Sequence, residues 1–188
     1  YQNEPIPEEV EGGAERLEAD AIASKLNGRE RGTAPEACVT LTAFVDVHER
    51  MLFYAVCAWE EDFAGYVVDY GTYPDQQRPY FTTRDAQRTL GRSHQGMGTE
   101  GAVYAGLTAL VGQLLSKEWP RDDGAVLKVD LCLIDQGWQR DLVHQFCRQS
   151  GRSPIVMPSR GQGITASQKP ISEYDRRRGD HIGHNWWV

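Results

Sequence analysis

The sequence has few cysteines, and none of the four lies in a Cys-x-x-Cys pair. That spacing gives no support to a zinc site or a disulfide framework, so we expect buried free thiols in a reducing compartment. No apolar run is long enough to cross a bilayer, and residues 1–13 are acidic without the apolar core of a signal peptide. We therefore expect a cytoplasmic protein with no membrane partner.

A phosphate-binding motif of the form Gly-x-x-x-x-Gly-Lys-Ser/Thr is also absent, so the sequence carries no ATP-driven motor of its own. The net charge of −7 argues against a protein that coats nucleic acid by charge alone. The charge is uneven, however: residues 1–30 hold three basic and eight acidic residues, whereas residues 148–178 hold seven basic and two acidic residues. The basic end is suited to phosphate contacts, although from charge alone a solvated loop is the simpler interpretation.

The length of 188 residues fits one domain with a hydrophobic core, because 40% of the residues are hydrophobic and 25% are charged. We expect residues 1–36 to form an acidic arm, a short amphipathic helix over 14–27 and a polar connector. Residues 37–188 are expected to form the folded domain. Its last part is rich in glycine and arginine and closes on two tryptophans and a valine, from which we expect truncation at the C-terminus.

Hydrophobic periodicity predicts a series of strands and helices after residue 36. Three apolar runs separated by short polar breaks predict hairpin-connected strands, and the middle run is apolar on both faces, which indicates a sheet covered on both sides. A long polar stretch over 72–98 is compatible with a short helix at 82–90, and Thr99 is expected to cap the next helix. The predicted strands lie at 37–46, 51–59, 63–71, 126–134 and 154–158, and the longer helices at 99–117 and 138–149.

This order of three strands, helix, strand, helix and strand predicts an α/β fold. The first three strands would form an antiparallel meander, and a crossover through the helix would place the next strand parallel to the first. Helices would flank the resulting mixed sheet. The ribonuclease H-like fold has this order, although a shared fold does not establish a function.

Two aspartates, Asp46 and Asp135, each stand at the end of a predicted strand. If these strands are neighbours, the carboxylates lie side by side and repel each other unless a cation binds between them. Mg²⁺ and Mn²⁺ prefer oxygen ligands, and two such ions about 4 Å apart activate a water and stabilise the leaving oxygen of a phosphodiester. Taken singly, Asp46 also fits a turn and Asp135 a helix cap, but their coincidence with the strand order favours a metal-dependent nuclease.

Three segments resemble the nuclease domain of phage-lambda-type terminase large subunits. They are LTAFVDVHERMLFYAVCAWEEDFAGYVVDYG at 41–71, with the family's Thr-Ala-x-x-Asp strand, CLIDQGW at 132–138, and VMPSRG at 156–161. The similarity extends over residues 15–161. It implies an endonuclease that cuts concatemeric double-stranded DNA for viral packaging, with Asp46 and Asp135 as ligands of two Mg²⁺ or Mn²⁺ ions.

The same resemblance implies partners and a missing ligand. The parent chain would carry an upstream ATPase domain, and the terminase small subunit and portal protein would be partners in the host-cell cytoplasm. The family uses a third acid on a later helix, which we expect beyond residue 188. We therefore expect weak metal binding or inactivity from this fragment by itself.

Further residues are candidates for supporting roles. Asp69 ends the third predicted strand and is a possible additional ligand, although a surface aspartate ending a strand is the simpler interpretation. His48 stands beside Asp46 and is suited to assist a water or a metal, although it also fits a turn. Basic side chains after the last strand are suited to positioning contacts with DNA phosphates. These are Arg160, Lys169, Arg176 and Arg177.

Two other functions stay open from the residues alone. The first is another ribonuclease H-like enzyme, of the resolvase or transposase type. The second is a non-catalytic module that docks DNA or a portal protein. The missing third acid and the acidic composition favour docking for this fragment, whereas the two strand-end aspartates favour the nuclease for the intact protein.

Overall fold

The computed structural model describes residues 18–25 and 28–161, and the chain divides into two compact units, at residues 1–31 and 32–188. In the first unit, α1 (Ala19–Ala23) is helical and lies inside the helix predicted over 14–27. The second unit holds the remaining elements. The boundary of the arm at residue 36 stays a prediction.

The described part of the second unit contains a main sheet, a small hairpin and three helices. The main sheet consists of β1 (Thr40–Val47), β2 (Leu52–Trp59), β3 (Gly65–Tyr73), β6 (Leu131–Asp135) and β7 (Val156–Ser159). The hairpin consists of β4 (Trp119–Pro120) and β5 (Val126–Leu127), and the helices are α2 (Leu90–Ser93), α3 (Gly98–Ser116) and α4 (Arg140–Gln149).

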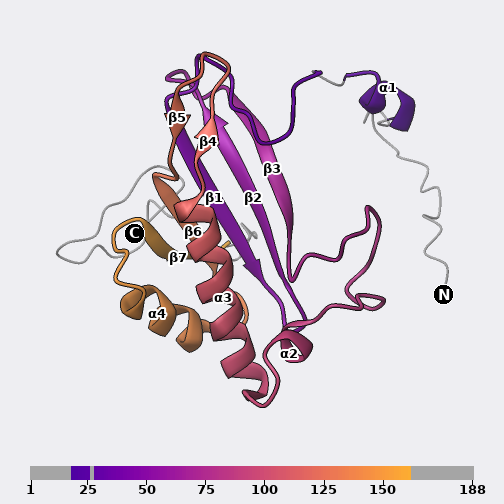
Figure 1. Ribbon diagram of the computed structural model, residues 1–188, viewed down its shortest axis with the longest axis vertical. Helices are drawn as coiled ribbons and strands as arrows, with labels where there is room; N and C mark the ends of the chain where they lie inside the picture. Colours follow the sequence, from indigo (N-terminus) through magenta and orange to yellow (C-terminus); the bar gives the residue numbers. More distant parts are fainter. Residues whose placement is uncertain (1–17, 26–27, 162–188) are drawn as a thin grey trace, which may run out of the picture. The chain divides into compact units, whose positions relative to one another are not determined.

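The strands of the main sheet follow the order β3-β2-β1-β6-β7. β1 pairs antiparallel with β2, and β2 with β3, whereas β6 lies parallel to both β1 and β7. Figure 1 shows α3 crossing from the meander back to β6. The predicted α/β fold, with a ribonuclease H-like mixed sheet and flanking helices, is confirmed.

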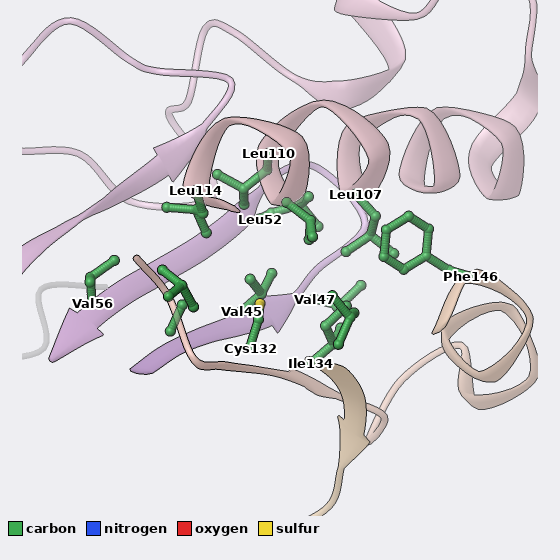
Figure 2. Packing of buried hydrophobic residues seen from close by; sticks show 14 of the residues in the cluster. Val45, Val47, Leu52, Val56, Leu107, Leu110, Leu114, Cys132, Ile134 and Phe146 are labelled. Atoms are coloured by element: carbon green, nitrogen blue, oxygen red, sulfur yellow. The ribbon is translucent and has the colours of Figure 1, made fainter. Parts of the chain in front are cut away.

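One face of the sheet carries the hydrophobic core. Side chains alternate along β1, so the odd-numbered residues from Leu41 to Val47 are buried. Figure 2 shows this face packed against α3 through Leu107 and against α4 through Phe146, with Ile134 of β6 below them. Each fully buried leucine, isoleucine or valine contributes about 1.5–3 kcal/mol through removal of apolar surface from water.

The opposite face is only partly covered within the described residues. It carries Phe44, which is 42% exposed in the middle of a central strand, with Leu131 and Leu133 half-buried on the neighbouring strand. These side chains line a hollow of about 690 Å³. The sheet therefore differs from the expectation of cover on both sides, because α3 and α4, as described, pack on the same face.

Two predicted elements differ from those observed. The strand predicted over 126–134 is divided: its first part pairs with β4, and its second part is β6. The side chain of Asp130 marks the break, since its Oδ2 accepts a hydrogen bond from the Leu41 N–H at 2.9 Å. The helix predicted over 82–90 is wrong, because only Leu90–Ser93 is helical, and Thr99 does not cap α3, whose N-cap is Met97.

A matched pair of glycines on α3 tests the packing of this core. A Cβ on Gly106 would press into the buried Leu90 side chain, whereas a Cβ on Gly112 would meet nothing within 4 Å. We expect Gly112→Ala to stabilise the protein by about 0.8–1.0 kcal/mol, because alanine is the better helix former. We expect Gly106→Ala to be destabilising by roughly 1 kcal/mol, because overpacking outweighs that gain. Urea unfolding followed by circular dichroism measures both, and equal shifts would contradict the packing described here.

Candidate metal site

The parallel pairing of β1 with β6 brings the two predicted ligands together. The last pair in the register of these strands is Val45 and Ile134, and Asp46 and Asp135 come one residue further along each strand. Neighbouring strands lie about 4.8 Å apart. The two aspartates therefore occupy neighbouring positions at the same edge of the sheet, as the sequence predicted.

Both aspartates also lie on the same face. Asp46 follows Phe44 in the alternation of β1, and Asp135 follows Leu133 in that of β6, so both belong to the face opposite the core. Both residues are partly exposed, and the Asp46 side chain retains 44% of its accessible surface. The carboxylates are thus open to solvent and to a ligand.

The two carboxylates have few hydrogen-bond partners among the described residues. Asp46 Oδ2 lies 3.0 Å from His48 Nε2, and the His48 ring stands edge-on to Phe53 with centroids 5.4 Å apart. The Asp135 carboxylate has no hydrogen-bond partner among the described residues, and Gly137 leaves space beside it that a Cβ would fill at 3.0 Å from Oδ2. Oxygen lone pairs therefore remain free on both side chains.

The turn that follows Asp135 is held from two directions. The Gln136 N–H donates to the Ser159 carbonyl of β7 at 2.8 Å, and the Gln136 Oε1 lies 2.7 Å from His144 Nε2 on α4. These contacts fix the backbone next to the carboxylate. Sequence reasoning did not find Gln136 or His144, because their contact depends on how α4 packs and no motif marks it.

Asp69 is placed differently from the pair. A bulge leaves Val68 as an extra residue in β3, after which Asp69 stands opposite Val56, a residue of the core face. The Asp69 side chain is 10% exposed and lies 3.5 Å from Lys117 Nζ and 3.4 Å from the Tyr54 hydroxyl. Asp69 therefore belongs to a mostly buried polar cluster with Lys117 and Tyr54 on the core face of the sheet. It does not lie beside Asp46, which is on the opposite face.

Of the four basic residues predicted to contact phosphates, the structure describes only Arg160. Arg160 is exposed and comes directly after Ser159, the register partner of Asp135, so it leaves the sheet at the same edge. Lys169, Arg176 and Arg177 lie outside the described residues.

The donor set suits a hard divalent ion. Within residues 18–25 and 28–161, no group of three or more His, Cys, Asp or Glu side chains is arranged to hold a metal. Two free carboxylates nevertheless fit Mg²⁺, which keeps several waters and is often held by only one or two carboxylates. Burial raises the pKa of the Cys132 thiol to about 12 and that of Cys147 to about 11, so neither offers a thiolate at neutral pH.

Comparisons with known proteins bear on the family. A crystal structure of the Aquifex aeolicus member of the Ppx/GppA protein family is similar with 10% identity and a TM-score of 0.34, over 64% of this chain and 35% of that one. A likeness at that level carries no functional argument. No curated protein matched the chain. No helix in the described part has the length and hydropathy needed to span a membrane.

A family model gives the assignment. The model of the terminase large subunit gpA endonuclease domain matches residues 4–185, which is nearly the whole chain. The matched residues include Asp46 near the end of β1 and Asp135 at the end of β6, and the match agrees with the resemblance seen in the three sequence segments. The chain therefore belongs to the family of terminase large subunit gpA endonuclease domains.

Proposed function

We propose that this domain hydrolyses phosphodiester bonds of double-stranded DNA with divalent metal ions held by Asp46 and Asp135. One observation carries the proposal. The two aspartates are neighbours across a parallel strand pair, on the same open face, and His48, beside Asp46, is their one side-chain hydrogen-bond partner among the described residues. Asp130, by contrast, uses its carboxylate to cap the backbone of β1, and Asp69 lies in the polar cluster with Lys117.

Each residue of the site has a distinct part in this proposal. Asp46 and Asp135 hold up to two Mg²⁺ or Mn²⁺ ions, and His48 orients the Asp46 carboxylate through their 3.0 Å contact. Bound ions of this kind lower the pKa of a water and stabilise charge on the leaving oxygen. Arg160 contacts a DNA phosphate near the site, and Lys169, Arg176 and Arg177 extend that contact.

The biological setting follows from the family and is proposed with it. The substrate is concatemeric viral DNA, which the domain cuts during packaging in the host-cell cytoplasm. An ATPase domain upstream in the parent chain moves the DNA, and the terminase small subunit and portal protein are the partners. Residues 1–36 serve as the connector, and residues 37–188 form the nuclease domain.

A docking function is the second candidate. It is favoured by the finding that the described residues contain no cluster of three potential metal ligands. In that case the domain holds DNA or a portal protein, and cutting is done elsewhere. The family match favours the terminase function over a resolvase or transposase.

The first prediction concerns the two ligands. In a protein that extends past residue 188, we expect Asp46→Asn and Asp135→Asn each to reduce Mg²⁺- or Mn²⁺-dependent nicking of plasmid DNA by at least about a hundredfold, the scale of losing a strong electrostatic contact in the transition state. Folding should persist, because both side chains are partly exposed. Gel assays of nicking and thermal unfolding measure the two effects.

Asp69→Asn is the matched control. It removes a carboxylate from a strand of the same sheet, but from the core face, next to Lys117. We expect nicking to continue and the thermal midpoint to fall. Normal cutting by both the Asp46 and Asp135 variants would remove these residues from the site.

A second prediction concerns metal binding without DNA. Titration of Mn²⁺ into the 188-residue chain, followed by calorimetry, should detect weak binding that Asp46→Asn and Asp135→Asn both abolish. Either substitution is expected to abolish binding, because two carboxylates without a third ligand bind a divalent ion only when both are present. Absence of heat, combined with tight binding to a portal protein, would favour the docking function instead.

A third prediction concerns the space beside Asp135. In the longer protein, Gly137→Ala should reduce nicking at limiting Mn²⁺ and recover much of it at high Mn²⁺, because the added Cβ displaces the carboxylate without removing it. Gly161→Ala is the control, since a Cβ there meets nothing within 4 Å. Equal metal requirements for wild type and Gly137→Ala would show that this space does not matter.

A further inference from the structure

A long segment without strands leaves the sheet at the edge that carries the acidic pair. Val47 pairs with Leu52, and Leu52 with Tyr73, so β1 and β3 end at the same edge of the sheet with the start of β2 between them. The chain then runs through residues 74–98, which include α2 and the first residue of α3, and Figure 1 shows the part before α2 leaving the end of β3. It holds four arginines and two aspartates, in a chain of net charge −7.

Arg50 fixes this segment to the site. Arg50 stands four residues after Asp46, in the turn between β1 and β2. Its guanidinium donates to the carbonyl of Arg84 at 2.8 Å and to that of Ala86 at 3.0 Å, and also to the carbonyl of Thr83. Its own carbonyl accepts the Leu90 N–H at 2.8 Å. The segment is therefore tied to the strand end that presents Asp46.

Gln76 closes the base of the same segment. This residue is only 7% exposed. Its Nε2 donates to the Pro74 carbonyl at 2.9 Å and to the Arg88 carbonyl at 2.6 Å, and its Oε1 accepts the Arg88 N–H at 3.2 Å. Because Gln76 joins the start of the segment to Arg88 and Arg50 binds the part between them, the backbone before α2 is held in one arrangement without a regular helix or strand.

The arrangement turns arginine side chains to solvent. Arg84, Arg88 and Arg92 are exposed, and the Arg84 guanidinium has no hydrogen-bond partner among the described residues. Arg88 and Arg92 each donate to groups of the segment itself, but a guanidinium has five N–H donors and these bonds use only some of them. Tyr80, at 89% exposure, adds a phenol that can donate to a phosphate.

The charges of the two aspartates are largely used within the segment. Asp85 accepts hydrogen bonds from Thr82 and lies 3.4 Å from Arg78, and the Thr82 bonds, with Arg78, hold the pKa of Asp85 below its usual range. Asp75 accepts the Gln77 N–H at 2.9 Å. The four arginines and two aspartates give the segment a net formal charge of +2. Arg78 pairs with Asp85, so this positive charge lies on the side of the segment that carries Arg84, Arg88 and Arg92 and is reduced by Asp75.

We infer that residues 74–98 form the surface that holds the sugar-phosphate backbone of duplex DNA next to Asp46 and Asp135. The inference rests on the proposed nuclease function and names a contact surface for its substrate. Arginine guanidinium groups bind phosphates with bidentate geometry, and backbone contacts position a duplex without reading its sequence. A locally positive segment also overcomes the repulsion between DNA and an acidic protein, since charges beyond about 10 Å are screened at ordinary salt.

The test measures DNA binding without cleavage. The 188-residue chain is titrated against a fluorescein-labelled duplex in EDTA at several salt concentrations, and anisotropy gives the dissociation constant. We expect Arg84→Gln to weaken binding at low salt by about fivefold and to reduce the slope of log K against log salt by about 1, as one lost phosphate contact requires. Arg84→Lys should retain the slope.

Two triple variants separate the loss of positive charge from the loss of the arginine side chains. Changing Arg84, Arg88 and Arg92 together to glutamine should lower the slope by about 3, whereas changing all three to lysine should leave it near the wild-type value. Arg148→Gln is the matched control, because Arg148 is exposed at the end of α4, away from the acidic edge, and it should bind like wild type. Equal slopes for wild type and the triple glutamine variant, or no salt-dependent binding by wild type, would overturn the inference.

The DNA-binding test and the cleavage test distinguish a failure of the contact surface from a failure of the nuclease site. Asp46→Asn and Asp135→Asn should bind the duplex with an unchanged salt slope while losing cleavage in the longer protein. If the arginine variants bind normally and the aspartate variants do not cut, the contact surface is wrong and the nuclease site stands. If the aspartate variants cut normally, the site is wrong, and the slopes still decide whether residues 74–98 bind DNA.

Discussion

The parallel pairing of β1 with β6 is the constraint on which the site depends. Asp46 and Asp135 are far apart in the sequence, and only this strand pair makes them neighbours. A shift of the pairing by one residue would turn one aspartate toward the core while the other stayed on the open face. The register is fixed by burial, because Val45 and Ile134, directly before the two acids, are both fully buried. The hydrophobic core therefore sets the geometry of a polar site that it does not touch.

The sequence predicted those parts of the fold that have a strong local pattern. The three meander strands and the helix of α3 were found to within a few residues, because apolar alternation and a helical stripe are visible without tertiary information. The hairpin of β4 and β5 was missed, since two-residue strands have no measurable period. The short helix predicted over 82–90 is wrong, because the conformation of these residues is set by Arg50 and Gln76, whose contacts are long-range and follow no motif.

The residues of the site likewise divide into those that local sequence patterns predict and those whose position depends on tertiary packing. Asp46 and Asp135 were predictable, because each ends an apolar strand in a chain order that places those strands together. Asp69 ends a similar run, yet the bulge at Val68 and the approach of Lys117 place it in a different environment. A bulge adds one residue and changes which face the following side chains occupy, so periodicity alone cannot assign Asp69 to a face. The contact between Gln136 and His144 likewise depends on the packing of α4.

The exposure of the acidic pair decides how metal binding relates to folding. Two carboxylates at neighbouring positions would strongly destabilise a buried site, but Asp46 keeps 44% of its side-chain surface in contact with water, where screening makes their repulsion small. The sheet therefore does not need an ion to form, in contrast to small zinc domains whose folding requires the metal. In the proposed nuclease, metal affinity is limited by the two protein ligands and increases when a DNA phosphate supplies further oxygens. In that proposal, whatever holds the duplex at this edge of the sheet also raises the metal occupancy of the site, so the proposed activity depends on bound DNA.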